Sequence, residues 1–482
     1  MRRLFFAFAL TIAFAASGVE LPKDPLLLRR FLEEMPKGGD LHEHLSGAVY
    51  AETYLDWAMQ DGLCIDKTQL AIAEPPCEQT RGLVPAKELT RDATLYSHMI
   101  DALSMRNFHA AVDNGHDHFF ATFTKFSAVS ARHAPEMLAN VATRFAAENV
   151  DYIESLFSPD KGASPRLGAM LTPGAPFEEM RDSLLKSGKV AEVVAFARKN
   201  LDQFDAAVQK ASPGTTIRYL VQVHRGIPRE QFFAELVVGF ELATIDPRVV
   251  GLNPVMPEDS PASMANFSEQ MGMFAYLRPL YPKVHLSAHA GELAPGLVPP
   301  EGLRNHIRDT VMIAKAERIG HGVDVARESN MPELLKTMAA RGVAVEICLT
   351  SNDVILGVKG ANHPLRLYLQ NHVPVVLATD DPGVSRGDLT TEFQRAAQEH
   401  GLGYADLKRL ARNSIEYSFL EGPSLWTNVK YEAYVCGNAC DAFVAKSAKA
   451  REEWRLEQRL RAFESRVTSP ADSTAHASSA PR

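Results

Sequence analysis

The sequence predicts an α/β protein, a (β/α)8 barrel of the TIM type, with helices before the first strand and an insertion directly after it. Three observations support this prediction. Short apolar runs of strand length recur eight times along the 482-residue chain, amphipathic stretches lie between most of them, and polar residues gather at the C-terminal ends of the runs. Hydrophobic residues make up 46% of the chain, which is enough for a large core.

The eight predicted strands alternate with predicted helices along the chain, which favours a closed parallel sheet. The strands are expected at residues 39–47, 150–158, 216–225, 249–256, 283–292, 318–323, 343–351 and 374–382. Residues 134–149 and 331–341 have helical periodicity, and the second of these ends at Gly342 as a helix should. Residues 51–149 separate the first two strands, and we predict that they form an insertion on the top face of the barrel.

The two ends of the chain are predicted to lie outside the folded domain, which covers residues 19–467. Residues 1–18 resemble a signal peptide, because Arg2 and Arg3 precede a short apolar run and then small residues. This pattern predicts a secreted or periplasmic protein, and an uncleaved anchor helix is the alternative. No later stretch is apolar and long enough to span a membrane. Residues 468–482 are rich in Ser, Ala and Pro and are predicted to be disordered.

Charge and cysteine content narrow the possible partners. The net charge of −8 argues against a general nucleic-acid or anionic-membrane binder. Export would permit disulfides. Cys64 and Cys77 bracket a short polar loop and could pair, Cys436 and Cys440 lie in a predicted turn, and Cys348 is expected to be a buried free thiol. The cysteines lack the spacing of a structural zinc knuckle.

Histidines and acids at the strand ends predict a metal site. His42 and His44 end the first strand and face the same way, since residues two apart in a strand share a face. His289 ends the fifth strand and Asp380 ends the eighth. Three imidazoles and one carboxylate suit one zinc ion with an open position for water.

Three further polar residues are predicted to act as acids or bases beside this site. Glu292 follows the fifth strand, His321 ends the sixth, and Asp381 is next to Asp380. Ser351 and Asn352, after the seventh strand, are expected to support the site rather than to react.

Other polar motifs are interpreted as unrelated to the metal. His116 and His118 copy the spacing of the first pair but lie in a helical segment, where residues two apart do not share a face. His285 is expected to pack inside the barrel. The sequence has no nucleophile elbow, no phosphate-binding loop and no cytidine-deaminase cysteine motif.

Five motifs in order resemble those of the adenosine deaminase family. They are PKGGDLHEHLSG, SAHAGE, RIGHG, EICLTSN and LATDDP, and they span nearly the whole predicted mature chain. The opening MPKGGDLHEH, the signal peptide, the cysteine-bearing insertion, SMR at 104–106 and FFATFTKF at 119–126 are more similar to the secreted growth-factor-type subfamily.

The resemblance implies a role for each matching residue. His42, His44, His289 and Asp380 would hold one zinc ion. Glu292 would protonate N1 of the purine, His321 would orient and help to deprotonate the attacking water, and Asp381 would bond to that water or to purine N7. His224 matches a histidine on the substrate side. The implied reaction is hydrolytic deamination of adenosine or 2′-deoxyadenosine, and a homodimer is the subfamily expectation.

Three positions depart from the family pattern. Ser46 stands where many members have an acid that meets the ribose, and Met256 stands where a glycine usually lets the backbone approach the purine. Leu349 replaces a more usual proline, and we expect little effect from this change. The first two changes affect substrate recognition and not the metal.

These departures leave four interpretations open. The first is adenosine or deoxyadenosine deaminase. The second is deamination of adenine, a modified nucleoside or a nucleotide, for which Arg225 is the one obvious phosphate-binding candidate. The third is a secreted nucleoside-binding or signalling protein without catalysis. The fourth is metal-assisted hydrolysis of an amide or ester.

Overall fold

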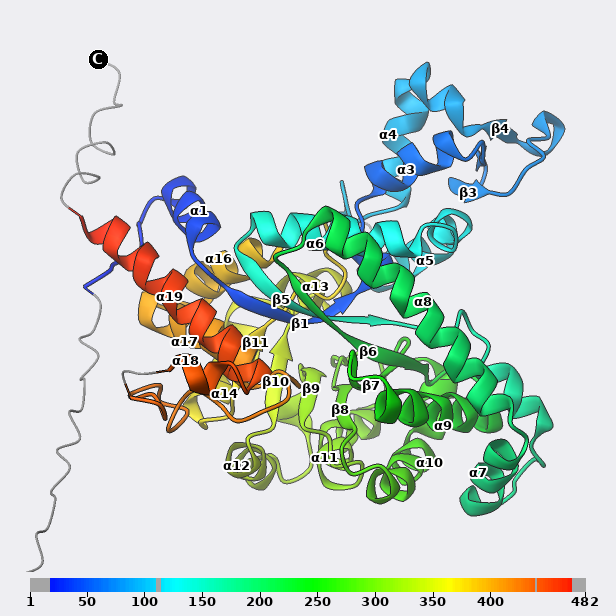
Figure 1. Ribbon diagram of the computed structural model, residues 1–482. Coiled ribbons are helices and arrows are strands. Elements are labelled where there is room, and N and C mark those ends of the chain that lie inside the picture. The colour runs from blue at the N-terminus through cyan, green and yellow to red at the C-terminus, as the bar shows by residue number, and fades with distance from the viewer. Residues whose placement is uncertain (1–17, 110–113, 438–439, 470–482) are drawn as a thin grey trace, which may run out of the picture.

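Eight parallel strands form one nearly closed barrel in the computed structural model, which describes residues 18–109, 114–437 and 440–469 (Figure 1). Each strand pairs with the next along the chain, so the predicted (β/α)8 barrel is confirmed. In order the strands are β1 (Gly38–His44), β5 (Val150–Phe157), β6 (Thr216–His224), β7 (Val249–Val255), β8 (His285–Ala290), β9 (Arg318–His321), β10 (Ala344–Ile347) and β11 (Val375–Leu377).

The first and last strands meet through only a few residues. The backbone N–H of His44 donates to the carbonyl of Asp380 at 2.9 Å, and that of Asp380 donates to the carbonyl of His42 at 2.9 Å. Glu43 and Asp380 form an isolated parallel bridge at this point. The seam that closes the barrel therefore lies at predicted metal ligands.

Helices surround the barrel because its strands are buried on both faces and need a cover on the outside. The main covering helices are α6 (Ala134–Ala147), α8 (Lys189–Ala211), α9 (Arg229–Ile245), α10 (Pro261–Leu277), α11 (His306–Met312), α12 (Met331–Arg341), α14 (Leu365–Gln370), α16 (Leu389–His400) and α17 (Tyr404–Glu416). Helix α12 ends at Gly342, whose φ of 66° is the left-handed conformation that suits a helix C-cap.

The two ends of the folded domain lie side by side (Figure 1). Helix α1 (Pro25–Glu34) begins after Asp24, whose side chain accepts hydrogen bonds from the backbone of Leu26 and Leu27. Helix α19 (Ala448–Thr468) packs against α17 and follows the short helix α18 (Asp441–Val444). The predicted signal peptide lies, apart from residue 18, outside the described residues, as does nearly all of the predicted tail. No helix among the described residues is long and apolar enough to cross a membrane.

The insertion after β1 projects from one end of the barrel (Figure 1). It contains helices, as predicted, and also a small antiparallel sheet that the sequence analysis did not predict. A disulfide joins Cys64 to Cys77 beside this sheet. The parts of the insertion are α3 (Ala51–Gln60), β2 (Cys64–Asp66), β3 (Ala71–Ala73), β4 (Leu83–Pro85), α4 (Ala93–Ala102) and α5 (Gly115–Ser130).

The other cysteines are also placed. Cys436 and Cys440 form a second disulfide, and Cys348 is a buried free thiol, as predicted. The remaining helices follow barrel strands: α2 (Leu45–Ala48) after β1, α7 (Phe177–Lys186) after β5, α13 (Leu349–Leu356) after β10 and α15 (Pro382–Ser385) after β11.

Candidate active site

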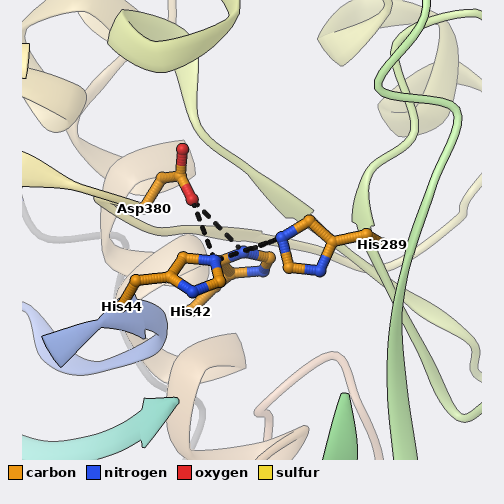
Figure 2. A group of neighbouring side chains, drawn as sticks. All are labelled: His42, His44, His289 and Asp380. Carbon is orange, nitrogen blue, oxygen red and sulfur yellow. Dashed lines mark hydrogen bonds and ion pairs between the residues drawn. The ribbon is translucent and has the colours of Figure 1, made fainter. Parts of the chain in front are cut away.

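Four side chains from segments far apart in the sequence converge at the C-terminal ends of the strands (Figure 2). The Nε2 atoms of His42 and His44 each lie 3.1 Å from Nε2 of His289. Oδ1 of Asp380 lies 3.5 Å from Nε2 of His42 and 3.4 Å from Nε2 of His44. All four potential ligand atoms lie within 4.8 Å of one another.

These separations fit a zinc ion. Ligand atoms bonded to zinc at about 2.0–2.1 Å lie about 2.9–3.6 Å apart in four- or five-coordinate sites, and five-coordination by these residues and a water keeps a place for that water. The observed separations of 3.1 to 3.5 Å lie within this range. Asp380 adds a negative charge, and burial lowers the pKa of His44 to about 3, so this imidazole is neutral and available as a ligand.

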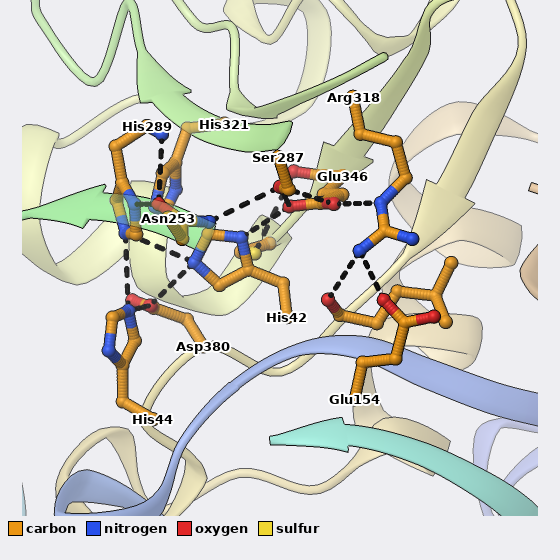
Figure 3. A network of polar contacts seen from close by, with 12 residues as sticks. His42, His44, Glu154, Asn253, Ser287, His289, Arg318, His321, Glu346 and Asp380 are labelled. Atoms are coloured by element: carbon orange, nitrogen blue, oxygen red, sulfur yellow. Dashed lines mark hydrogen bonds and ion pairs between the residues drawn. The ribbon is translucent and has the colours of Figure 1, made fainter. Parts of the chain in front are cut away.

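The other ring nitrogen of each histidine contacts a polar side chain from another strand of the barrel, and Figure 3 shows these contacts for His42 and His289. Nδ1 of His42 lies 2.6 Å from Oε2 of Glu346, and Nδ1 of His289 lies 2.7 Å from Oδ1 of Asn253. The side-chain amide of Gln222 contacts Nδ1 of His44 at 2.7 Å. Such partners fix the ring orientation and leave Nε2 to face the metal. The sequence analysis missed all three. The signal for them was a polar residue inside an otherwise apolar strand.

The carboxylate that holds His42 is itself part of a buried ion network. Nε of Arg318 donates to Glu346 at 2.5 Å, and Nη2 of Arg318 donates to Glu154 at 2.5 Å (Figure 3). Burial raises the pKa of Glu346, but Arg318 and His42 outweigh this effect and hold the pKa at about 2. Glu346 is therefore ionised and can accept the Nδ1 proton of His42.

The three predicted acid and base residues carry buried polar atoms without a hydrogen-bond partner. These atoms are Oε1 of Glu292, Nε2 of His321 and Oδ1 of Asp381. Nε2 of His321 lies 3.6 Å from Oε1 of Glu292. Buried polar groups are nearly always satisfied, so three such atoms beside one ligand cluster indicate a place for substrate and water.

Neighbouring side chains hold these groups in position. Both carboxylate oxygens of Glu258 accept backbone N–H groups, from Gly291 at 3.1 Å and from Glu292 at 2.8 Å. Asn352 bonds to Nδ1 of His321 at 2.9 Å, which agrees with its predicted supporting role. Burial raises the pKa of Glu292 well above its usual value, with further contributions from Asp380 and Glu258. A protonated carboxyl is what a proton donor requires.

Ser351 contacts Asp380, one of the predicted metal ligands. Its hydroxyl donates to Oδ2 of Asp380 at 2.5 Å. This leaves Oδ1 of Asp380 facing the histidines. Asp380 and His321 have φ values of 61° and 66°, a left-handed backbone conformation that residues other than glycine seldom adopt. Such strain is frequent at functional sites.

A cavity of about 380 Å³ opens beside the cluster. Its volume lies within the range of about 300–1,000 Å³ usual for small-molecule sites. Three residues predicted to contact substrate, Ser46, His224 and Met256, line it. Nδ1 of His224 lies 2.9 Å from Glu235. Met256 has a φ of 95°, a backbone conformation that glycine adopts more readily than other residues.

Two sequence interpretations need correction. Arg225 does not reach the mouth of the cavity: its side chain is 1% exposed and donates to the carbonyl of His289 at 2.7 Å. Arg225 therefore forms a buried hydrogen bond with the backbone of β8 and cannot bind a phosphate at the entrance of the cavity. His285 is not packed inside the barrel, because it begins β8, is 42% exposed and stacks on Phe419.

The histidines of α5 lie outside the ligand cluster, as predicted. Nε2 of His116 pairs with Asp259 at 3.0 Å, and Nε2 of His118 lies 2.9 Å from the carbonyl of Ser104. Both contacts attach α5 to neighbouring segments.

The fold and the site define a class of protein: a barrel hydrolase whose strand ends present a His–Asp cluster suited to a metal ion. Within this class, the chain belongs to the adenosine deaminase family, which it matches over residues 90–425. Members of this family are hydrolases that act on C–N bonds. The matched region includes His289, Glu292, His321 and Asp380 and begins after the first histidine pair.

Two curated relatives illustrate the match. The adenosine deaminase of Clostridium kluyveri is 23% identical over 412 residues, which cover 85% of this chain and 96% of that protein. The adenosine deaminase of Shewanella loihica is 37% identical over 136 residues, which cover 28% of this chain and only 38% of that protein.

Two solved structures share the fold. The N6-methyl-AMP deaminase from Arabidopsis thaliana has a TM-score of 0.56 and 18% identity, covering 89% of this chain and 98% of the other. An amidohydrolase from Burkholderia ambifaria with bound zinc has a TM-score of 0.54 and 19% identity, covering 94% and 99%.

Proposed function

We propose that this protein hydrolyses adenosine and 2′-deoxyadenosine to inosine and 2′-deoxyinosine with release of ammonia. One zinc ion would be held by His42, His44, His289 and Asp380. The single observation that carries this proposal is the set of unpartnered buried atoms on Glu292, His321 and Asp381 beside that cluster. A protein that only binds a nucleoside has no chemical need for this arrangement.

The residues divide the work of the reaction. When bound, zinc supplies a Lewis acid that lowers the pKa of water towards neutrality. Glu292 holds a proton for N1 of the purine, which makes C6 more open to attack. His321 and Asp381 orient the attacking water, and His321 takes up a proton from it. That proton then passes to the 6-amino group, the C6–N bond breaks and ammonia leaves, while the oxygen of the water stays on C6 as the 6-oxo group.

The lining of the cavity favours an uncharged substrate over a nucleotide. Among the described residues, no lysine or arginine lines it, whereas Glu292, Asp380 and Asp381 do. A phosphate bound in this cavity would have no cationic side chain among the lining residues to pair with. The Arabidopsis relative acts on a nucleotide, so this difference in substrate is open to a direct test.

The first experiment is an assay of the zinc-loaded chain from residue 19 onward with adenosine, 2′-deoxyadenosine, adenine and AMP. The change from 6-amino to 6-oxo purine would be followed by absorbance together with ammonia release. We expect turnover of both nucleosides, inhibited by a chelator. Turnover of AMP or adenine alone would show that the proposed substrate is wrong and the proposed reaction is right. No turnover of any purine would overturn the whole proposal.

Two substitutions test the roles within the site. Glu292→Gln should keep zinc but reduce kcat by about 100- to 10,000-fold, as expected for loss of a general acid. His289→Ala should lose both zinc and activity. His285→Ala is the matched control, because His285 lies on the same strand but away from the cluster. Normal zinc content in His289→Ala would contradict the ligand assignment.

Export and self-association are further parts of the proposal. The predicted signal peptide and two disulfides favour an oxidising compartment outside the cytoplasm. N-terminal sequencing of the mature protein should find a start near residue 19. A homodimer is proposed on the subfamily resemblance, and light scattering of the purified protein would test it.

A further inference from the structure

The cavity has one wall made of aromatic side chains from the insertion. Phe119, Phe120 and Phe123 of α5 line it, and Ile355 of α13 continues the apolar surface. The ring centroids of Phe119 and Phe120 are 5.3 Å apart, and those of Phe119 and Phe123 are 5.8 Å apart. We call these four residues the aromatic wall.

The aromatic wall is held firmly against the barrel. Gly115, at the start of α5, packs so closely on the carbonyl of Val354 that a Cβ would lie 1.9 Å from its oxygen. His116 pairs with Asp259, which follows β7, at 3.0 Å. Behind the wall, Phe126 stacks on Tyr54 with ring centroids 4.8 Å apart. The wall is therefore a fixed part of the cavity and not a loose surface.

The proposed reaction determines which end of a nucleoside faces outward. C6 must lie at the ligand cluster and N1 at Glu292, and N9 leaves the purine on the opposite side of the ring. The sugar then points away from the cluster. Ser46, Thr124 and His224 are polar residues of the lining that can meet its hydroxyls. The outer carbon of the sugar, C5′, would approach the aromatic wall.

We propose that the preferred substrate is a 6-aminopurine nucleoside with an uncharged, apolar group at C5′, such as a 5′-deoxy-5′-alkylthio nucleoside. This inference rests on the proposed deamination. An apolar group gains free energy by leaving water for the aromatic wall, whereas a hydroxyl gains little and a phosphate loses its hydration. Deamination consumes water and releases ammonia at C6, and the C5′ group is unchanged.

The test compares kcat/KM of the zinc-loaded wild-type protein on five compounds: adenosine, 5′-deoxyadenosine, 5′-methylthioadenosine, AMP and N6-methyladenosine. We expect 5′-methylthioadenosine to exceed adenosine by about tenfold, as for burial of one or two carbon-sized groups. AMP should fall below adenosine by on the order of a hundredfold or more, since its charge has no partner.

The outcomes separate this inference from the proposed function. Turnover of adenosine without any advantage for the 5′-methylthio compound would overturn the inference alone. A marked preference for N6-methyladenosine would also overturn it, because the wall would then meet the leaving amine. No turnover of any of the compounds would overturn both.

A wall substitution gives an independent check. Phe123→Ala should reduce the ratio of kcat/KM for 5′-methylthioadenosine to that for adenosine to about one, because the apolar contact is lost. Phe196→Ala is the matched control, since Phe196 is 43% exposed on the outer helix α8 and should keep the wild-type ratio. An unchanged ratio in Phe123→Ala would contradict the role of the wall.

Discussion

At the scale of single residues, Gly47 is required because Asp381 occupies the space of a side chain. A Cβ on Gly47 would lie 1.6 Å from Oδ1 of Asp381. Gly47→Ala should therefore displace Asp381 and lower kcat by about 100-fold, the usual effect of a misplacement of about 1 Å. Zinc content, measured by elemental analysis, should be unchanged.

The control for this prediction is Gly214→Ala, because the nearest atom to a Cβ there is Arg455 Nη2 at 3.8 Å. This variant should have wild-type kcat. Full activity of Gly47→Ala would mean that Asp381 has no fixed position in the reaction.

Glu258 is a positioning residue, because it holds the backbone that carries Glu292. Its carboxylate accepts the N–H groups of Gly291 and Glu292, and Nδ1 of His306 lies 2.6 Å away. In Glu258→Gln one of the two oxygens is replaced by an amide NH2 group, which cannot accept a hydrogen bond. One of the two backbone N–H groups therefore loses its acceptor. We expect kcat to fall by about 10- to 100-fold, with KM and zinc content changed little.

A merely structural role of Glu258 would not change the pH profile of kcat, so this profile distinguishes a structural role from a positioning role. In Glu258→Gln the alkaline limb, assigned to deprotonation of Glu292, should shift to lower pH, because the negative charge of Glu258 helps to raise the pKa of Glu292. Glu453→Gln is the control: Glu453 is also buried and accepts a backbone N–H, from Leu425, far from the site. A similar loss in both variants would contradict the positioning role.

The sequence predicted the candidate metal ligands better than the residues that hold them in position. His42, His289 and Asp380 lie in short motifs at strand ends, where barrel enzymes place their chemistry. Gln222 and Glu346 act through contacts with distant parts of the chain, and no local pattern shows which strand will lie beside them. The sequence also did not show where the side chain of Arg225 points. Its position at a strand end did not indicate that this side chain turns into the core.

At the scale of elements, α5 depends on an ion pair whose strength varies with pH. Asp259 raises the pKa of His116, partly opposed by burial, and Asp117 raises it further. A raised folded pKa means that the contact stabilises below the ordinary histidine pKa of about 6.5 and is lost as pH rises through the folded value. The start of α5 should therefore be held more firmly at low pH.

Asp259→Asn tests this prediction through the melting temperature. The difference between wild type and variant should be larger at about pH 5.5 than at about pH 8.5, since only the protonated imidazole gains from the charge. Asp117→Asn is the control with a smaller effect, because Asp117 is 74% exposed. A difference that does not vary with pH would contradict the proposed ion pair.

The antiparallel sheet of the insertion, which the sequence analysis did not predict, has strands too short to show a periodic pattern. All eight barrel strands lie where apolar runs predicted them. The strands β2, β3 and β4 have only three residues each, and the Cys64–Cys77 disulfide joins β2 to the segment between β3 and β4. A three-residue strand shows at most one alternation of polar and apolar residues, so pairing across the insertion decides its structure.

At the scale of the whole molecule, metal binding should stabilise the barrel itself. The proposed ligands come from β1, from β8 and from the segment after β11, so an ion would link the first and last strands across the seam. Binding to the folded state alone contributes about 4 kcal/mol when the free ion is at a thousand times its Kd.

Chelation should therefore lower the melting temperature in calorimetry, and added zinc should restore it. His42→Ala is the control: it should melt at a lower temperature than the zinc-loaded wild type and should not respond to the chelator. Equal melting temperatures for the zinc-loaded and the metal-free wild-type protein, with metal loss confirmed by elemental analysis, would exclude a structural contribution of the ion.

The closing seam also determines when the site can form as the chain is made. A growing chain has His42 and His44 early, gains His289 much later, and lacks Asp380 until residue 380 of 482 has been added. The strand pairing that brings Asp380 to His42 and His44 can form only after that. The complete ligand set is therefore a property of the nearly finished chain, and a fragment that stops before β11 would present three histidines with no carboxylate to complete them.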